Sequence, residues 1–222
     1  MLRKWNELND QEWFPRAAPF AVFMAFIMLE SLFSGYVYQI YIVKTIVVGS
    51  LLFLFKDKYT ELKWSASLRD IMTALIFGLA VFVLWINMTW DFAVMGELRS
   101  ENPFEKAAGG LLYPALFFRV AGASIVVPVM EELFWRSFII RWIDSNNFLS
   151  VPLGTFTMRS FIITVLLFGS EHTLWLAGIM AAVIYNILLY YKKDLWLCII
   201  AHAVTNFVLA VYVLSTHRWT FW

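Results

Sequence analysis

The chain has 222 residues, of which 61% are hydrophobic, 15% are charged and the formal net charge is +1. Soluble domains are about half apolar and about a quarter charged, so this composition excludes an ordinary soluble protein and indicates a polytopic membrane protein. A net charge near zero also argues against nucleic acid as a partner. We expect an all-α transmembrane bundle of about 7–8 helices that forms a single domain over residues 1–222.

The N-terminus and the single cysteine further restrict the class of membrane protein. Residues 1–7 lack the charged-then-apolar pattern of a cleavable signal peptide, so the apolar run that starts near Ala17 is expected to be an uncleaved anchor. A single cysteine, Cys198, excludes a disulfide framework and a cysteine metal site, and its apolar neighbours predict an inert core thiol.

Seven apolar segments are long enough to be considered as membrane crossings. They cover about 17–34, 36–55, 69–88, 112–143, 160–175, 176–191 and 195–214. The fourth is too long for one straight crossing and contains Pro114 and Pro128, so we expect a kink or break near Pro128. The fifth and sixth are short and are expected to form a helical hairpin that turns near residues 171–178.

The lysines and arginines of the loops predict the orientation. Loop 56–69 holds four of them, whereas loop 89–111 holds two against four acidic residues. Positively charged loops stay on the cytoplasmic side, so we expect a cytoplasmic N-terminus and, after seven crossings, an external C-terminus. The expected location is the inner membrane of a bacterium.

Six polar residues interrupt segments that otherwise resemble membrane helix. They are Glu131, Glu132, Arg136, His172, His202 and Asn206. A charged side chain at mid-bilayer costs roughly 2.5–3.5 kcal/mol on insertion scales, so such residues usually face the protein interior and often serve function. At 1.5 Å per residue, they lie roughly 12–20 Å from the same membrane face, although His172 is close to the outer turn of its hairpin.

The spacing of these residues suits hydrolytic chemistry. Glu132 and Arg136 are four residues apart with the acid first, which is the favourable order for an ion pair on a helix. Glu131 points about 100° away from Glu132, so one carboxylate can be structural while the other activates water.

His202 and Asn206 share a helix face and are able to orient water or stabilise an oxyanion. A carboxylate and two histidines, here Glu131, His172 and His202, are the ligands of several hydrolytic zinc sites. The water could therefore be activated by a bound Zn²⁺ or by the glutamate alone. In both cases water activated by Glu131 attacks an amide carbonyl.

The three motifs, taken in order, resemble a known family. Glu131-Glu132-x-x-x-Arg136, Phe168-x-x-x-His172 and His202-x-x-x-Asn206 are similar to the motifs of the CPBP intramembrane metalloproteases, the CAAX prenyl protease and Abi group. The resemblance covers about 112–214, the expected catalytic core. It also extends, more weakly, to a bacterial CAAX-protease-related clade found with exosortase sorting systems.

The resemblance implies an intramembrane endopeptidase whose site opens towards the cytoplasm. It would cut a membrane-associated or lipid-anchored protein or peptide, with membrane lipid as its other partner. Glu131 would activate water, His202 and Asn206 would support it, His172 would pair with or orient Glu132, and Arg136 would hold the site together. Many relatives have glycine just after the arginine, where this chain has Ser137.

Other interpretations of the same residues remain open. Glu131, Glu132 and Arg136 could be a purely structural ion-pair cluster in a non-catalytic scaffold or pseudoprotease, and intramembrane Glu and His also serve proton-linked transporters. Glu171 fits either a catalytic neighbour or a solvated turn residue. Glu30 and Lys44, in the first two segments, are predicted to form a structural ion pair across their hairpin.

Overall fold

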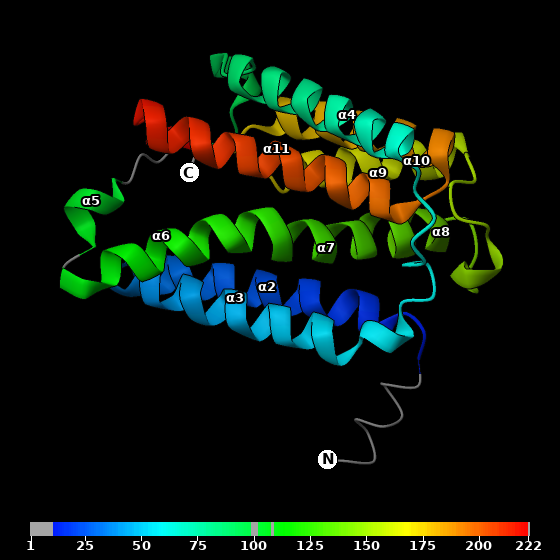
Figure 1. Ribbon diagram of the computed structural model, residues 1–222, viewed down its shortest axis with the longest axis horizontal. Helices are drawn as coiled ribbons and strands as arrows, with labels where there is room; N and C mark the ends of the chain where they lie inside the picture. Colours follow the sequence, from blue (N-terminus) through cyan, green and yellow to red (C-terminus); the bar gives the residue numbers. More distant parts are fainter. Residues whose placement is uncertain (1–10, 99–101, 108, 222) are drawn as a thin grey trace.

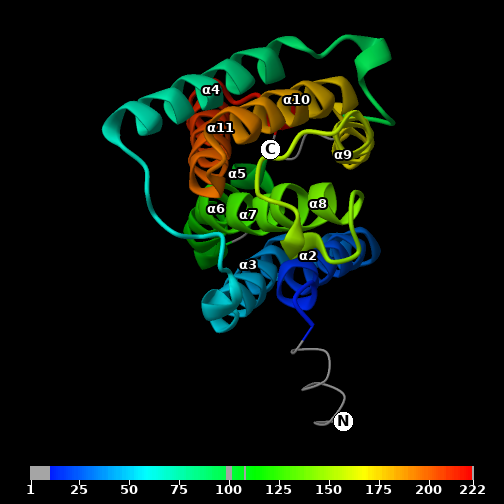
Figure 2. The same ribbon diagram turned by 90° about the vertical axis from the view of Figure 1, so that its right-hand side faces the viewer.

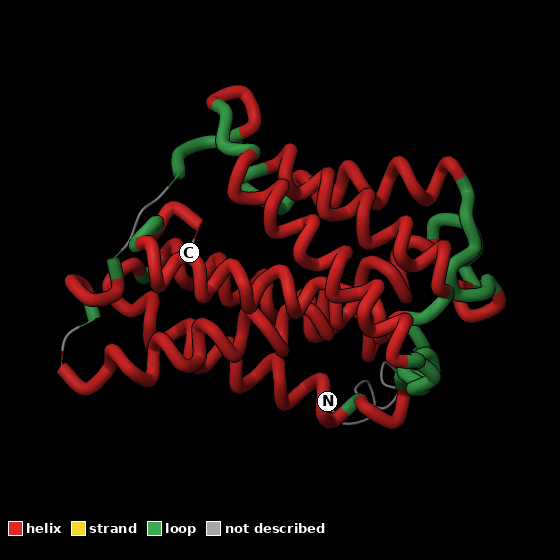
Figure 3. Tube along the Cα trace, turned by 45° about the horizontal axis from the view of Figure 1, so that its top comes forward, coloured by secondary structure: helices red, strands yellow, loops and turns green. Residues whose placement is uncertain are grey.

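A computed structural model describes residues 11–98, 102–107 and 109–221, and these residues contain helices and loops but no strand. The principal helices are α2 (Phe14–Leu32), α3 (Val37–Leu54), α4 (Leu68–Asn87), α6 (Leu112–Ala121), α7 (Val127–Glu132), α8 (Ile140–Trp142), α9 (Met158–Ser170), α10 (Trp175–Lys192) and α11 (Leu195–Thr216), with a short α5 (Pro103–Lys106) before α6. They form a bundle whose loops lie mostly at its two ends (Figures 1 and 3). The predicted all-α polytopic bundle is therefore confirmed.

Six helical segments are long and apolar enough to cross a membrane. They are Phe14–Leu32, Ser34–Leu54, Leu68–Asn87, Gly109–Trp142, Trp175–Lys192 and Leu195–Thr216. The seventh predicted crossing corresponds to α9, whose 13 residues span about 20 Å and fall short of a full hydrocarbon layer. The predicted hairpin is present, with its turn between Ser170 and Trp175.

The long central segment Gly109–Trp142 stays helical through Pro128 rather than breaking there. Its 34 residues include two π-helical stretches, η5 (Gly122–Val126) and η6 (Leu133–Ile139), which enclose the six-residue α7. Proline cannot donate the backbone hydrogen bond from residue i to residue i−4. A π turn holds one extra residue and uses a different hydrogen-bond spacing. The predicted break is absent, and the helical winding changes on both sides of Glu131 and Glu132.

The central helix lies between two layers (Figure 2). The α2–α3 hairpin packs on one side of it, and α9, α10 and α11 lie on the other, with α4 outside them. The predicted pair of Glu30 and Lys44 ties α2 to α3, with Lys44 Nζ 2.8 Å from Glu30 Oε1. The central helix therefore meets both layers, which places its polar residues at the middle of the bundle.

A tight turn aligns α10 with α11. Lys193 adopts a left-handed conformation (φ 54°) that ends α10, and Asp194 caps α11 by accepting a hydrogen bond from the Trp196 amide at 2.8 Å. Because this turn is so short, Tyr185 and His202 lie at the same level on the two antiparallel helices, where their rings stack with centroids 5.0 Å apart.

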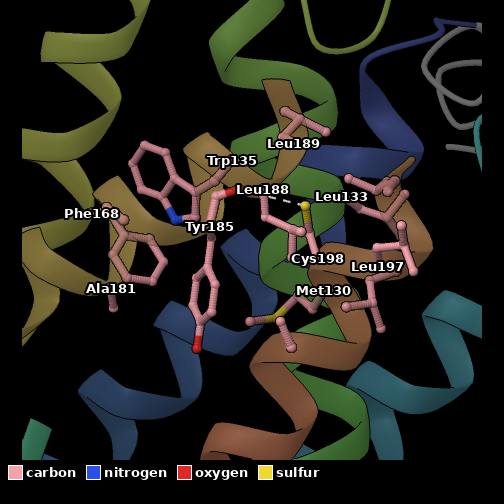
Figure 4. Packing of buried hydrophobic residues seen from close by; sticks show 14 of the residues in the cluster. Met130, Leu133, Trp135, Phe168, Ala181, Tyr185, Leu188, Leu189, Leu197 and Cys198 are labelled. Atoms are coloured by element: carbon pink, nitrogen blue, oxygen red, sulfur yellow. Dashed lines mark hydrogen bonds between the residues drawn. The ribbon is translucent and has the colours of Figure 1, made fainter. Parts of the chain in front are cut away.

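The core beneath this turn is densely packed. Leu133, Leu188, Leu189 and Leu197 are at most 1% exposed and surround Cys198, which is fully buried (Figure 4). The predicted inert core thiol is confirmed as buried, and its Sγ contacts the Tyr185 carbonyl oxygen at 3.6 Å.

Two ends of the bundle differ in charge. One end is formed by the α3–α4, α8–α9 and α10–α11 connections, and we call it the basic end. Its basic residues are Lys56, Lys58, Lys63, Arg69, Arg141, Arg159, Lys192 and Lys193. The opposite end is formed by the α2–α3 and α4–α6 connections, the α9–α10 turn and the residues after α11. In Figure 1 the basic end is at the right and the opposite end at the left.

Candidate active site

Side chains from the central helix and α11 converge at mid-bundle. His202 Nδ1 donates a hydrogen bond to Glu132 Oε1 at 2.9 Å, and the same oxygen accepts from Arg136 Nη1 at 3.4 Å. The predicted ion pair of Glu132 and Arg136 is therefore confirmed. Glu132 and Arg136 are 0% and 1% exposed, so the three groups form a buried charged network.

Glu131 points to the other side of the same imidazole. Its Oε2 lies 3.9 Å from His202 Nε2 and has no hydrogen-bond partner among the described residues. Buried polar atoms are normally satisfied by protein or by ordered water, so a free carboxylate oxygen at a cavity wall marks a place for water or a ligand. Glu132 Oε2 also lacks a partner, but Glu132 does not line the cavity and its Oε1 is held by His202 and Arg136, so Glu131 is the carboxylate placed to react.

Arg136 is fixed by residues that the sequence motifs did not include. Its Nε donates to Asn186 Oδ1 at 3.2 Å, and its guanidinium lies 4.3 Å from the centroid of the Phe168 ring. Asn186 Nδ2 in turn donates to Thr164 Oγ1 at 3.3 Å. The one available signal for Asn186 was a lone amide in the apolar run Ala181–Leu189.

His202 is held in place by aromatic and hydroxyl contacts on α10 and α4. Tyr185 stacks on its ring and donates its hydroxyl to Thr205 Oγ1 at 2.8 Å. Thr205 Oγ1 also donates to the Gly78 carbonyl oxygen at 2.8 Å, which attaches α11 to α4. The imidazole therefore has little freedom to leave Glu132.

His172 reaches the site from the α9–α10 turn but makes different contacts from those implied by the resemblance. Its Nδ1 donates to the Phe168 carbonyl oxygen at 2.8 Å, and its ring meets Trp85 edge-on at 5.3 Å. The partner of Glu132 is His202 and not His172. His172 nevertheless lines the same cavity as Glu131 and His202.

Asn206 lies one turn after His202 and faces the central helix. Its Nδ2 donates to the Ala123 carbonyl oxygen at 2.8 Å, within η5. An amide nitrogen carries two protons, so one remains for a ligand. Glu171, by contrast, is exposed at the turn and accepts a hydrogen bond from Trp135 Nε1 at 3.1 Å.

A cavity of about 190 Å³ collects the reactive groups. Its polar lining includes Glu131, His172, His202 and Asn206, and its apolar lining includes Phe168. Glu132 and Arg136 lie behind this wall. Four of the six predicted site residues therefore meet the cavity. Of the other two, Glu132 contacts His202 from inside the protein and Arg136 contacts Glu132.

The same side chains are also candidate ligands for a metal ion. Within 11–98, 102–107 and 109–221, no three His, Cys, Asp or Glu side chains are grouped to hold one ion. His172 Nδ1 donates to a backbone carbonyl, which leaves Nε2 as the nitrogen able to bind a metal, but Glu131, His172 and His202 are not grouped to hold one ion in this structure. The zinc alternative stays a prediction, and no step below passes through a metal.

One family model matches part of the chain. Residues 113–208 match the model of the type II CAAX prenyl endopeptidase Rce1-like family. The matched segment contains all six predicted site residues. No curated protein and no solved structure matches the chain.

Proposed function

Because residues 113–208 match the model of the type II CAAX prenyl endopeptidase Rce1-like family, we propose that this chain is a glutamate-dependent intramembrane endopeptidase. It would hydrolyse a peptide bond near a membrane-associated or lipid-anchored segment of its substrate. The observation that carries the proposal is the free Oε2 of Glu131, which faces a cavity beside His202 Nε2.

Glu131 acts as the base in this mechanism. Its carboxylate takes a proton from a water molecule in the cavity while the water oxygen forms a bond to the carbonyl carbon of the substrate amide. The carbonyl π electrons move to oxygen and give a tetrahedral oxyanion. Glu131 then returns the proton to the amide nitrogen, the C–N bond breaks, and the products are a carboxylic acid and an amine.

Asn206 and His202 would support the charge that develops. The second proton of Asn206 Nδ2 is available to the oxyanion, and a donor of this kind is worth several kcal/mol when it is fixed before the reaction. Glu132 accepts from His202 Nδ1 and so stabilises a proton on Nε2, which would let this nitrogen donate as well.

Glu132 and Arg136 serve as positioning residues. Neither lines the cavity, but together they fix the tautomer and direction of the His202 ring. Their opposite charges also balance each other. A single movable proton on Glu131 suits general acid–base chemistry in an apolar site.

The test compares protein termini in membranes of cells that express the wild type or Glu131→Gln at equal folded levels. Termini present only with the wild type would identify the substrate and the bond. Glu97→Gln is the matched control, because Glu97 is an exposed carboxylate in the α4–α6 connection. Identical termini in all three samples would contradict the proposal and favour a scaffold.

A further inference from the structure

Asn186 is a buried amide in an apolar part of α10. It is 1% exposed, and Leu188 and Leu189, which follow it closely in the chain, are fully buried. Burying an amide without hydrogen bonds is costly, so a residue of this kind needs partners for both of its polar atoms. Asn186 has them from two other helical segments: Arg136 of the central helix contacts Oδ1, and Thr164 of α9 contacts Nδ2.

The orientation of this amide is set by α9. Thr164 Oγ1 lies 2.6 Å from the Ser160 carbonyl oxygen and 3.1 Å from that of Phe161. A carbonyl oxygen only accepts, so the single proton of the Thr164 hydroxyl points to these carbonyls and its oxygen is left to accept from Asn186. The amide nitrogen of Asn186 therefore faces Thr164, at 3.3 Å, and the amide oxygen faces Arg136. Since arginine carries only donors, Arg136 requires the same orientation.

Arg136 depends on Asn186 for its direction. Its Nη1 donates to Glu132 at 3.4 Å and its Nε donates to Asn186 at 3.2 Å, whereas Nη2 has no hydrogen-bond partner among the described residues. Glu132 lies four residues before Arg136 on the central helix, so this contact alone does not fix the guanidinium relative to the rest of the bundle. In the part of the chain that the structure describes, the hydrogen-bond partner from another helix is Asn186.

The contacts continue from Asn186 to the His202 ring. Asn186 accepts from Arg136, which in turn donates to Glu132 Oε1. The same oxygen accepts from His202 Nδ1 at 2.9 Å. A fixed guanidinium keeps Glu132 Oε1 in one place, and this oxygen sets the direction of the imidazole. Asn186 is absent from the lining of the active-site cavity, so it does not contact a substrate bound beside Glu131.

We propose that Asn186 is a positioning residue of the active site and that it acts on His202 through the Arg136 guanidinium. It fixes the direction in which the imidazole presents Nε2 towards Glu131, whose Oε2 lies 3.9 Å from that nitrogen. The effect of Asn186 on cleavage rests on the proposed peptidase function. Its effect on the ring is a property of the folded protein without substrate.

The ring is observed by NMR spectra of the protein in detergent, prepared with isotope-labelled histidine. The ring signals of His202 are identified by their loss in His202→Gln. Asn186→Leu removes both polar contacts of the amide, and Thr164→Val removes the one that orients it. Thr45→Val is the matched control, because Thr45 is buried in α3 and also donates to the carbonyl oxygen four residues before it, that of Tyr41.

We expect Asn186→Leu to shift or broaden the His202 signals, Thr164→Val to do so to a smaller extent, and Thr45→Val to leave them unchanged. His172 is the internal reference, because its Nδ1 donates to a backbone carbonyl oxygen and its signals should stay in place. Identical His202 signals in Asn186→Leu and the wild type would overturn the inference. Equal shifts of His172 and His202 would also overturn it, because they would indicate a general disturbance of the fold. If Asn186→Leu does not fold, the same two criteria apply to Thr164→Val.

Cleavage of a substrate identified from its new termini gives the second readout. At equal folded levels, Asn186→Leu should lower kcat by up to roughly 100-fold, because small misplacements of active-site groups have effects of this size. KM should stay the same, since Asn186 does not meet the substrate. An unchanged kcat in Asn186→Leu, with loss of cleavage in Glu131→Gln, would overturn the positioning role and leave the peptidase function standing. Altered His202 signals without cleavage by the wild type would support the contact with the ring and contradict the peptidase function alone.

Discussion

His202 and Glu132 lie 70 residues apart in the chain and share a hydrogen bond of 2.9 Å at the centre of the bundle. This contact gives the two adjacent glutamates different environments. Glu132 Oε1 has a cation and an imidazole as partners, whereas Glu131 lines the cavity and its Oε2 has no hydrogen-bond partner among the described residues. The difference leads to opposite expectations for the same substitution at neighbouring positions.

Glu131→Gln should abolish cleavage and leave folding intact. Loss of a general base lowers rates by roughly 10²–10⁴-fold, and Oε2 makes no hydrogen bond that glutamine would lose. A neutral amide is also less costly to bury than a carboxylate, so the melting temperature should stay the same or rise. Substrate processing in membranes and thermal unfolding in detergent measure the two effects. A large fall in melting temperature would show that Glu131 is structural.

Glu132→Gln should destabilise the fold strongly. Removing one member of a buried ion pair leaves the other charge uncompensated, which costs about 3–5 kcal/mol. Arg136 is 1% exposed and would be that charge. In detergent, the melting temperature should fall clearly for Glu132→Gln. It should partly recover when Glu132→Gln is combined with Arg136→Met. Equal stability of Glu132→Gln and wild type would contradict the network described here.

Much of the site could be predicted from the sequence because the helical repeat fixes local geometry. Glu132 and Arg136, four residues apart, had to share a helix face, and polar residues in apolar helices had to face inward. The choice between His172 and His202 as partner of Glu132 could not be made in this way, because it depends on where α9 ends and how α11 packs. Asn186 was missed for the same reason.

Two further features depended on contacts between distant segments. Ser137, which stands where many relatives have glycine, donates its hydroxyl to Glu61 in the α3–α4 connection, a contact that no local pattern indicates. Pro128 predicted a kink or break, whereas the helix continues through it with π turns on either side. Helix types and spans follow from composition, whereas winding and pairing follow from packing.

Gly78→Ala should weaken both the fold and the activity. A Cβ at this position would lie 2.4 Å from the Ala201 carbonyl oxygen, so α4 would have to move away from α11, next to His202. Overpacking of this kind costs about 1–3 kcal/mol. Gly35→Ala is the control, because nothing lies within 4 Å of its Cβ. The melting temperature and the rate of substrate processing should both fall for Gly78→Ala. Equal values for Gly78→Ala and Gly35→Ala would show that the close approach of the helices is not needed.

Acid should destabilise the protein through Glu61, which lies in the α3–α4 connection. Burial alone would raise the pKa of Glu61, but the hydrogen bonds and charge of Arg16 and the Ser137 hydroxyl outweigh it and hold the pKa below the ordinary 4.5. A carboxyl whose pKa is lower in the folded than in the unfolded state stabilises the fold fully above the unfolded value. That stabilisation is lost as the pH falls through the folded pKa, where the contacts with Arg16 lose their charge.

Melting temperatures measured from pH 7 down to below the ordinary pKa should therefore fall more steeply for the wild type than for Glu61→Gln, which has no proton to gain. Parallel curves for the two proteins would mean that other carboxylates control the acid transition.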